Sequence, residues 1–138
     1  MTKTYLAFDF GLKRVGVACG NSVMCQAQPL RTIAAEGDAR FGPIKKLIDE
    51  WRPDALVVGV PFHPDGAEHE MTLRARRFAR QLNGRFNLPV HEVDERYSSV
   101  EAERDDPDDL DSAAAAIILQ QFFNETPPTS TPLEGDAR

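Results

Sequence analysis

The chain has 138 residues, of which 41% are hydrophobic and 28% are charged, and its formal net charge at pH 7 is −6. This length suits one domain with a single core, and the composition is that of an ordinary globular protein. No apolar run approaches the roughly 20 residues that span a bilayer, and no secretory signal is present, so we expect a cytoplasmic protein without a membrane partner. Two cysteines, Cys19 and Cys25, are too few for a disulfide framework and are expected to be free thiols.

The charges are unevenly distributed along the chain. Residues 101–111 contain seven carboxylates, whereas residues 74–85 contain five arginines. The chain can therefore have a local basic face although its net charge is negative, and nucleic acid is not excluded as a partner.

The first third of the chain predicts three strands joined by short connections. They are expected at residues 4–9, at residues 14–20 and within residues 24–33, which together favour an antiparallel meander. Pro29 places the third of these strands at an edge of the sheet, because proline cannot donate a ladder hydrogen bond.

The remainder predicts helices that alternate with buried strands. Helical spacing of apolar residues within residues 37–54 is followed by a continuous apolar strand at residues 54–60. A second helix is expected at residues 68–83, with Asn83-Gly84 as its stop. A strand within residues 88–96 and a last helix at residues 109–123 follow.

This order of elements predicts an α/β fold. Right-handed crossovers make the fourth and fifth strands parallel to the first, which gives a mixed five-stranded sheet with helices on both faces. We expect one domain over residues 1–123 and a disordered tail over residues 124–138, which is rich in proline and hydroxyl residues.

Three carboxylates are placed where they could meet. Asp9 lies at the end of the first strand, Glu95 lies just beyond the last strand, and Asp111 lies at the edge of the apolar stripe of the last helix. Ligands in open α/β sheets bind beyond the carboxyl ends of parallel strands. A cluster of carboxylates there predicts Mg²⁺ or Mn²⁺, with two ions expected, because these cations prefer oxygen ligands and relieve the mutual repulsion.

Each carboxylate also has a purely structural interpretation. Asp9 could cap the turn at Gly11, and Asp111 could complete a capping arrangement begun by Asp108. Glu95 could pair with neighbouring arginines at the surface.

Several stretches together resemble one known family. The segments "AFDFGLKRVGVACGN", "LVVGVPFHPDG", "RARRFARQL", "VHEVDERYSSVEAE" and "DLDSAAAAIILQQF" occur in the order and near the spacing of the YqgF-like (RuvX) family of bacterial nucleases. The resemblance covers residues 4–123. It implies an RNase H-like fold and metal-dependent hydrolysis of phosphodiester bonds, with Asp9, Glu95 and Asp111 at the acidic positions of the family.

The resemblance also implies a substrate. The role described for such families is maturation of the 5′ end of precursor 16S ribosomal RNA, and members are also described as Holliday-junction resolvases. A resolvase would favour a symmetric dimer, whereas RNA trimming needs none, so both a monomer and a homodimer stay open. The basic residues expected to bind the substrate are Lys13, Arg14, Arg74, Arg77 and Arg96.

One departure from the family keeps other functions open. Members usually carry a longer, basic segment between the "DER" stretch and the last helix, whereas residues 97–108 are short and acidic here. Phosphate contacts supply much of the affinity for nucleic acid, so a catalytically weak nucleic-acid-binding or ribosome-assembly factor is a second hypothesis. A third is nucleotide binding in the manner of actin and sugar kinases, which would require two such lobes.

Overall fold

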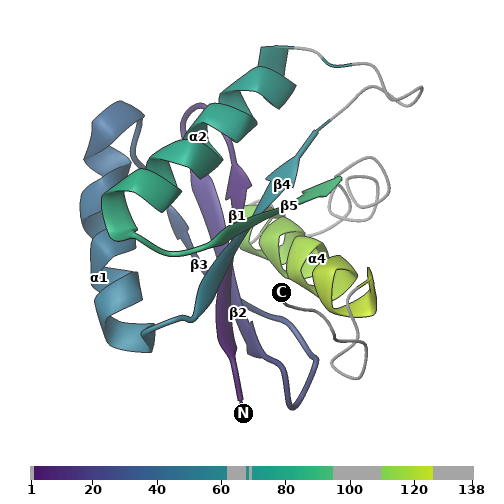
Figure 1. Cartoon of the computed structure of the whole chain (residues 1–138). Coiled ribbons are helices and arrows are strands. Elements are labelled where there is room, and N and C mark those ends of the chain that lie inside the picture. Colours follow the sequence, from purple (N-terminus) through teal and green to yellow (C-terminus); the bar gives the residue numbers. More distant parts are fainter. Residues whose placement is uncertain (1, 62–67, 69, 95–109, 126–138) are drawn as a thin grey trace.

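A computed structural model describes residues 2–61, 68, 70–94 and 110–125 of the chain (Figure 1). Three strands come first and are followed by alternating helices and strands, as predicted. In chain order the elements are β1 (Thr4–Phe10), β2 (Val15–Asn21), β3 (Gln28–Ile33), the 3-10 turn η1 (Gly37–Arg40), α1 (Phe41–Trp51), β4 (Ala55–Val60), α2 (Glu70–Phe86), β5 (Val90–Asp94) and α4 (Leu110–Glu125).

The five strands form one mixed sheet in the order β3-β2-β1-β4-β5. The first three are antiparallel neighbours, and β4 and β5 run parallel to β1. The mixed sheet of the sequence prediction is therefore confirmed. Pro29 lies in β3, which is an edge strand, as a residue without a backbone N–H requires.

Helices cover both faces of the sheet. On one face, α1 and α2 pack on a core that contains Leu6, Phe8 and Phe78, and on the other face α4 packs on a core that contains Ala7 and Val57 (Figure 1). Alternate residues of β1 therefore serve opposite layers, as the period of a strand dictates. No helix in the described part of the chain is both long and apolar enough to span a membrane.

The end of α2 differs from the prediction. The helix continues past Asn83-Gly84 to Phe86 and stops where Asn87 takes a left-handed conformation with φ of 57°. The Asn87 backbone N–H donates to the Asn83 carbonyl at 2.9 Å, and the Asn83 side chain donates to the Leu88 carbonyl at 2.8 Å. This is a left-handed helix cap, and asparagine tolerates it better than most residues.

The buried face of α4 also differs from the prediction. The helical spacing predicts that Ala114, Ile117, Ile118 and Gln121 face the core, and of these four only Ile118 is buried. The buried side chains of α4 are Ser112, Ala115, Ile118, Leu119 and Phe123. The helix is apolar on nearly all sides, so spacing alone does not define which side meets the sheet. It ends at Glu125, two residues beyond the predicted domain limit, and residues 126–138 lie outside the described part.

Gly16 of β2 is the point where α4 meets the sheet most closely. A Cβ atom at this position would overlap the carbonyl group of Asp111 and approach the Ser112 nitrogen to 2.8 Å. These are backbone atoms of the first turn of α4, which cannot rotate away. Only glycine lets this helix turn rest directly on the strand.

We therefore expect Gly16→Ala to destabilise the fold by about 1–3 kcal/mol, because the added methyl group forces α4 away from the sheet. Urea unfolding measures the change. Gly84→Ala is the matched control, because nothing lies within 4 Å of its Cβ position in the exposed part of α2. That change should stabilise the protein by about 0.5–1 kcal/mol. Equal stability of the two variants would contradict the close contact at Gly16.

Candidate active site

Asp9 is the second-last residue of β1, at the carboxyl end of the strand. It pairs with Gly16 of β2 and with Gly59 of β4. Its side chain shares the face of Ala7, which packs in the α4 layer, and it is half-buried. The position agrees with the sequence prediction of a carboxylate at a strand end.

Asp111 approaches the same place from the opposite layer. It lies in the first turn of α4, directly above Gly16, and its side chain is 27% exposed. Because Gly16 is also the cross-strand partner of Asp9, the backbones of Asp9 and Asp111 both lie against a single glycine at one end of the sheet. Two of the three predicted acidic residues are thus brought together by β1, β2 and α4.

The third acidic residue cannot be placed. Glu95 and Arg96 lie outside the described residues, as do the acidic segment 97–108 and Asp108 of the capping alternative. The preceding residue, Asp94, ends β5 opposite Val60 of β4, and its carbonyl accepts a 3.0 Å hydrogen bond from the Gln121 side chain of α4. Within the described residues, no group of three or more His, Cys, Asp or Glu could hold a metal ion.

The cationic neighbour of Asp111 is Arg14, in the turn between β1 and β2. Its Nε donates to Oδ2 of Asp111 at 3.0 Å, and the Arg14 side chain is 61% exposed. The hydrogen bond turns Asp111 toward the β1–β2 turn and engages one of its two oxygens. Carboxylate oxygens of this kind are the ligands that hard cations such as Mg²⁺ and Mn²⁺ prefer, so Asp9 and Asp111 fit the predicted metal.

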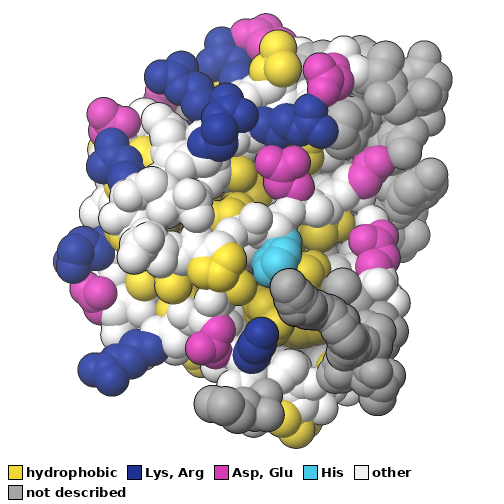
Figure 2. All heavy atoms as spheres, in the orientation of Figure 1, with side chains coloured by type: hydrophobic (Ala, Val, Ile, Leu, Met, Phe, Trp, Pro, Cys, Tyr) yellow, Lys and Arg dark blue, Asp and Glu magenta, His cyan; other side chains and the backbone are white. Residues whose placement is uncertain are grey.

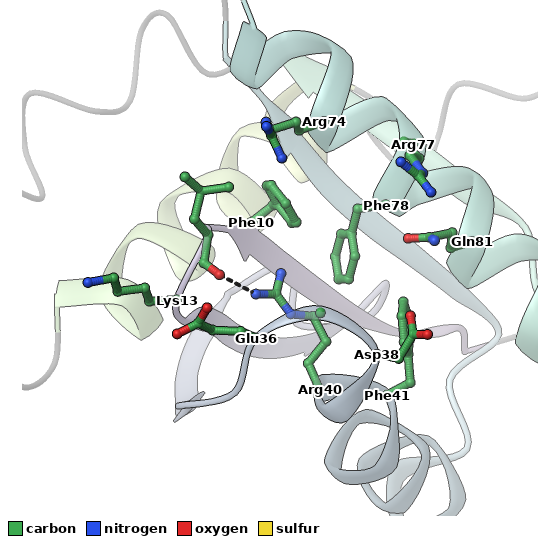
Figure 3. A pocket seen from close by; sticks show the side chains of 12 residues that line it. Phe10, Lys13, Glu36, Asp38, Arg40, Phe41, Arg74, Arg77, Phe78 and Gln81 are labelled. Carbon is green, nitrogen blue, oxygen red and sulfur yellow. Dashed lines mark hydrogen bonds between the residues drawn. The ribbon is translucent and has the colours of Figure 1, made fainter.

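Apart from Arg96, which lies outside the described residues, the other predicted basic residues lie on the opposite side of the sheet. Lys13, Arg74 and Arg77 line a cavity of about 520 Å³ between the β1–β2 turn, η1 and α2 (Figure 3). Arginines gather over α2 on the molecular surface (Figure 2). Arg74 is paired with Glu70 at 2.6 Å, one turn earlier in the helix. The described members of the predicted substrate-binding set are therefore divided, with Arg14 beside Asp111 and with Lys13, Arg74 and Arg77 around the cavity.

Two features of this region were missed by sequence reasoning. The first is Gly16, although a glycine inside a strand is a recognisable signal of close backbone approach. The second is Arg40, which is only 3% exposed and donates to the carbonyls of Gly11 and Leu12 at 3.0 and 2.7 Å. Nothing in the sequence distinguishes Arg40 from a surface arginine, because its partners are backbone atoms from another part of the chain.

Comparison with known proteins gives close relatives and a shared fold. A protein from Albidiferax ferrireducens is 67% identical over 121 residues, which are 88% of this chain and 78% of that protein. One from Polaromonas sp. is 59% identical over 125 residues, which are 91% of each chain. Both carry the name "Putative pre-16S rRNA nuclease".

Among solved structures, T. thermophilus RuvC in complex with a Holliday junction substrate superposes with a TM-score of 0.58. The match covers 95% of this chain and 99% of RuvC at 16% identity, and it shows that the two share a fold. The family model described as "RuvX: Holliday junction resolvase" matches residues 3–125. The chain therefore belongs to the RuvX family, as its five segments of resemblance indicated.

Proposed function

We propose that this protein is a metal-dependent endonuclease that hydrolyses phosphodiester bonds during 5′-end processing of precursor 16S rRNA, in the cytoplasm. The observation that carries the proposal is the meeting of Asp9 and Asp111 around Gly16, at the carboxyl end of β1. The names of the relatives from Albidiferax and Polaromonas support the choice of substrate.

In the proposed hydrolysis, some residues of this chain would bind metal ions and others would position those ligands or contact the substrate. Asp9, Asp111 and the sequence-predicted Glu95 would hold two Mg²⁺ or Mn²⁺ ions. Such ions activate water and stabilise the leaving oxygen of a phosphodiester. Arg14 holds Asp111 in one orientation through Oδ2, which makes it a positioning residue, and Gly16 keeps the first turn of α4 close to β1. Arg96 would contact either a carboxylate or a phosphate.

Branched DNA is the alternative substrate, and the description of the matching family favours it. Cleavage of a four-way DNA junction, measured beside cleavage of a precursor 16S transcript, separates the two. A protein that binds RNA without cleaving either substrate would instead be the nucleic-acid-binding factor of the second hypothesis.

We expect Asp9→Asn to lower the rate of Mg²⁺-dependent cleavage by more than about 100-fold. Loss of a residue that only supports a metal ligand already costs about 10–100-fold, and Asp9 is proposed to be a ligand itself. The assay is the appearance of shortened product from a precursor 16S transcript.

Asp49→Asn is the control for the loss of a carboxylate. Asp49 lies on α1 and is 64% exposed, where it pairs with Lys45 at 2.9 Å. This variant should cleave at the rate of the unmodified protein. Equal cleavage by Asp9→Asn and the unmodified protein would contradict the proposed site and would point to a contaminating nuclease.

Arg14→Gln should lower the cleavage rate by about 10–100-fold at a fixed Mg²⁺ concentration, because Asp111 loses the donor that orients it. Titrating Mg²⁺ tests this explanation, since a defect in orientation raises the metal concentration needed for half-maximal rate. An unchanged rate and an unchanged titration midpoint would show that Asp111 does not depend on Arg14.

A further inference from the structure

The cavity beneath the β1–β2 turn has the size of a ligand site and lies outside the carboxylate cluster. Its volume of about 520 Å³ falls within the range of small-ligand pockets, roughly 300–1,000 Å³. Four cationic side chains line it, those of Lys13, Arg40, Arg74 and Arg77, against the two carboxylates of Glu36 and Asp38. Its lining therefore carries a positive charge on a protein whose net charge is −6.

Two of these cations are available to a ligand. Among the described residues, none forms an ion pair with Lys13 or Arg77. Of the two carboxylates, Asp38 already faces Arg85 at 3.6 Å. Lys13 and Arg77 line the cavity from the β1–β2 turn and from α2 respectively, and in Figure 3 they lie on opposite sides of it, with the Lys13 ammonium pointing away from Arg77. The long Lys13 side chain would have to rotate inward to meet the same anion as Arg77.

Arg40 is the buried cationic residue in the lining of the cavity. Its guanidinium binds the carbonyls of Gly11 and Leu12 and stacks over the Phe10 ring at 5.1 Å. Burial lowers the pKa of Arg40, and Glu36 partly opposes this shift, but a guanidinium stays protonated in proteins. Its Nε is buried and has no hydrogen-bond partner in the described structure, which leaves one donor of a buried cation unsatisfied.

The cavity and the carboxylates occupy the two faces of one sheet end. Asp9 faces α4, whereas the next residue, Phe10, lines the cavity. In the turn, Arg14 contacts Asp111 and its neighbour Lys13 lines the cavity. Consecutive Cα atoms are about 3.8 Å apart, so a single nucleic-acid strand crossing this turn could contact both places.

We infer that the cavity is a second phosphate-binding site, which takes a backbone phosphate of the substrate RNA to one side of the scissile bond. Lys13 and Arg77 would bind the phosphate, Arg74 would contribute charge, and Arg40 would position the turn that carries Lys13. This inference rests on the proposed function, because it names a second place where the same RNA is held.

The lining favours a phosphate and its sugar over a stacked base. Phe41 and Phe78 are only 5% and 1% exposed, so their rings offer almost no surface to a ligand. Phe10 is already in contact with Arg40 and with Phe78, whose ring centroid lies 5.1 Å away. The polar groups that line the cavity are the cationic side chains, the Gln81 amide and the carboxylates of Glu36 and Asp38, of which Asp38 faces Arg85.

The test measures RNA affinity without cleavage. A labelled transcript of the precursor 16S 5′ region is titrated with full-length protein in EDTA, at several KCl concentrations. Lys13→Gln and Arg77→Gln should each weaken binding about threefold to tenfold, and each should reduce the salt slope by about 0.7–0.9. Arg80→Gln is the matched control, an exposed arginine of α2 that does not line this cavity, and should change affinity less than about twofold.

The two proposals can fail separately in this design. If Lys13→Gln and Arg77→Gln bind RNA as Arg80→Gln does, the cavity is no RNA site, even if inorganic phosphate proves to bind there. If the unmodified protein shows no Mg²⁺-dependent cleavage while the two variants still weaken binding, the nuclease proposal fails and the phosphate site stands. Millimolar inorganic phosphate can also be added as a competitor of RNA. The phosphate site is supported if phosphate displaces RNA from the unmodified protein but not from Arg77→Gln.

Discussion

The contact between the first turn of α4 and Gly16 is the constraint on which the candidate site depends. Because no side chain separates them, the helix backbone rests on β2 beside the residue that pairs with Asp9. Asp111 thereby reaches the carboxyl end of β1 from a helix that begins 100 positions after that strand ends, since β1 ends at Phe10 and α4 begins at Leu110. Any larger residue at position 16 would push the first turn of α4, and with it Asp111, away from the strand that pairs with Asp9.

Side chains along a strand point alternately to the two faces of the sheet, which explains why the short segment from Asp9 to Arg14 contributes residues to both faces. Asp9 and Phe10 face opposite layers, as do Arg14 and Lys13 of the following turn in their contacts. The α4 side gathers carboxylates, and the α1–α2 side gathers cations around a cavity. The same sheet end thus carries acidic residues on one face and basic residues on the other, which is the arrangement that the proposed nuclease would need to hold a polyanion next to metal ions.

Buried Arg40 fixes the position of the β1–β2 turn, which carries one basic residue toward each face of the sheet. It joins η1, at the start of α1, to the turn that carries Lys13 and Arg14, through two backbone carbonyls and the Phe10 ring. These contacts offset part of the cost of burying the guanidinium, whose Nε has no hydrogen-bond partner among the described residues, and they tie Arg40 to the turn that carries both basic residues. A chain with an acidic total can in this way keep a local basic surface, over α2 and the cavity (Figure 2).

The sequence by itself determined the order of the elements, the mixed sheet and the place of Asp9 at a strand end, because strand alternation, proline positions and right-handed crossovers are local or nearly universal rules. It also identified the family. Tertiary structure decided what depends on contacts between distant segments: the buried side of the evenly apolar α4, the pairing of Arg14 with Asp111, and the burial of Arg40. It alone separated Lys13, Arg74 and Arg77 from Arg14, because the face on which a side chain lies follows from packing and not from its charge.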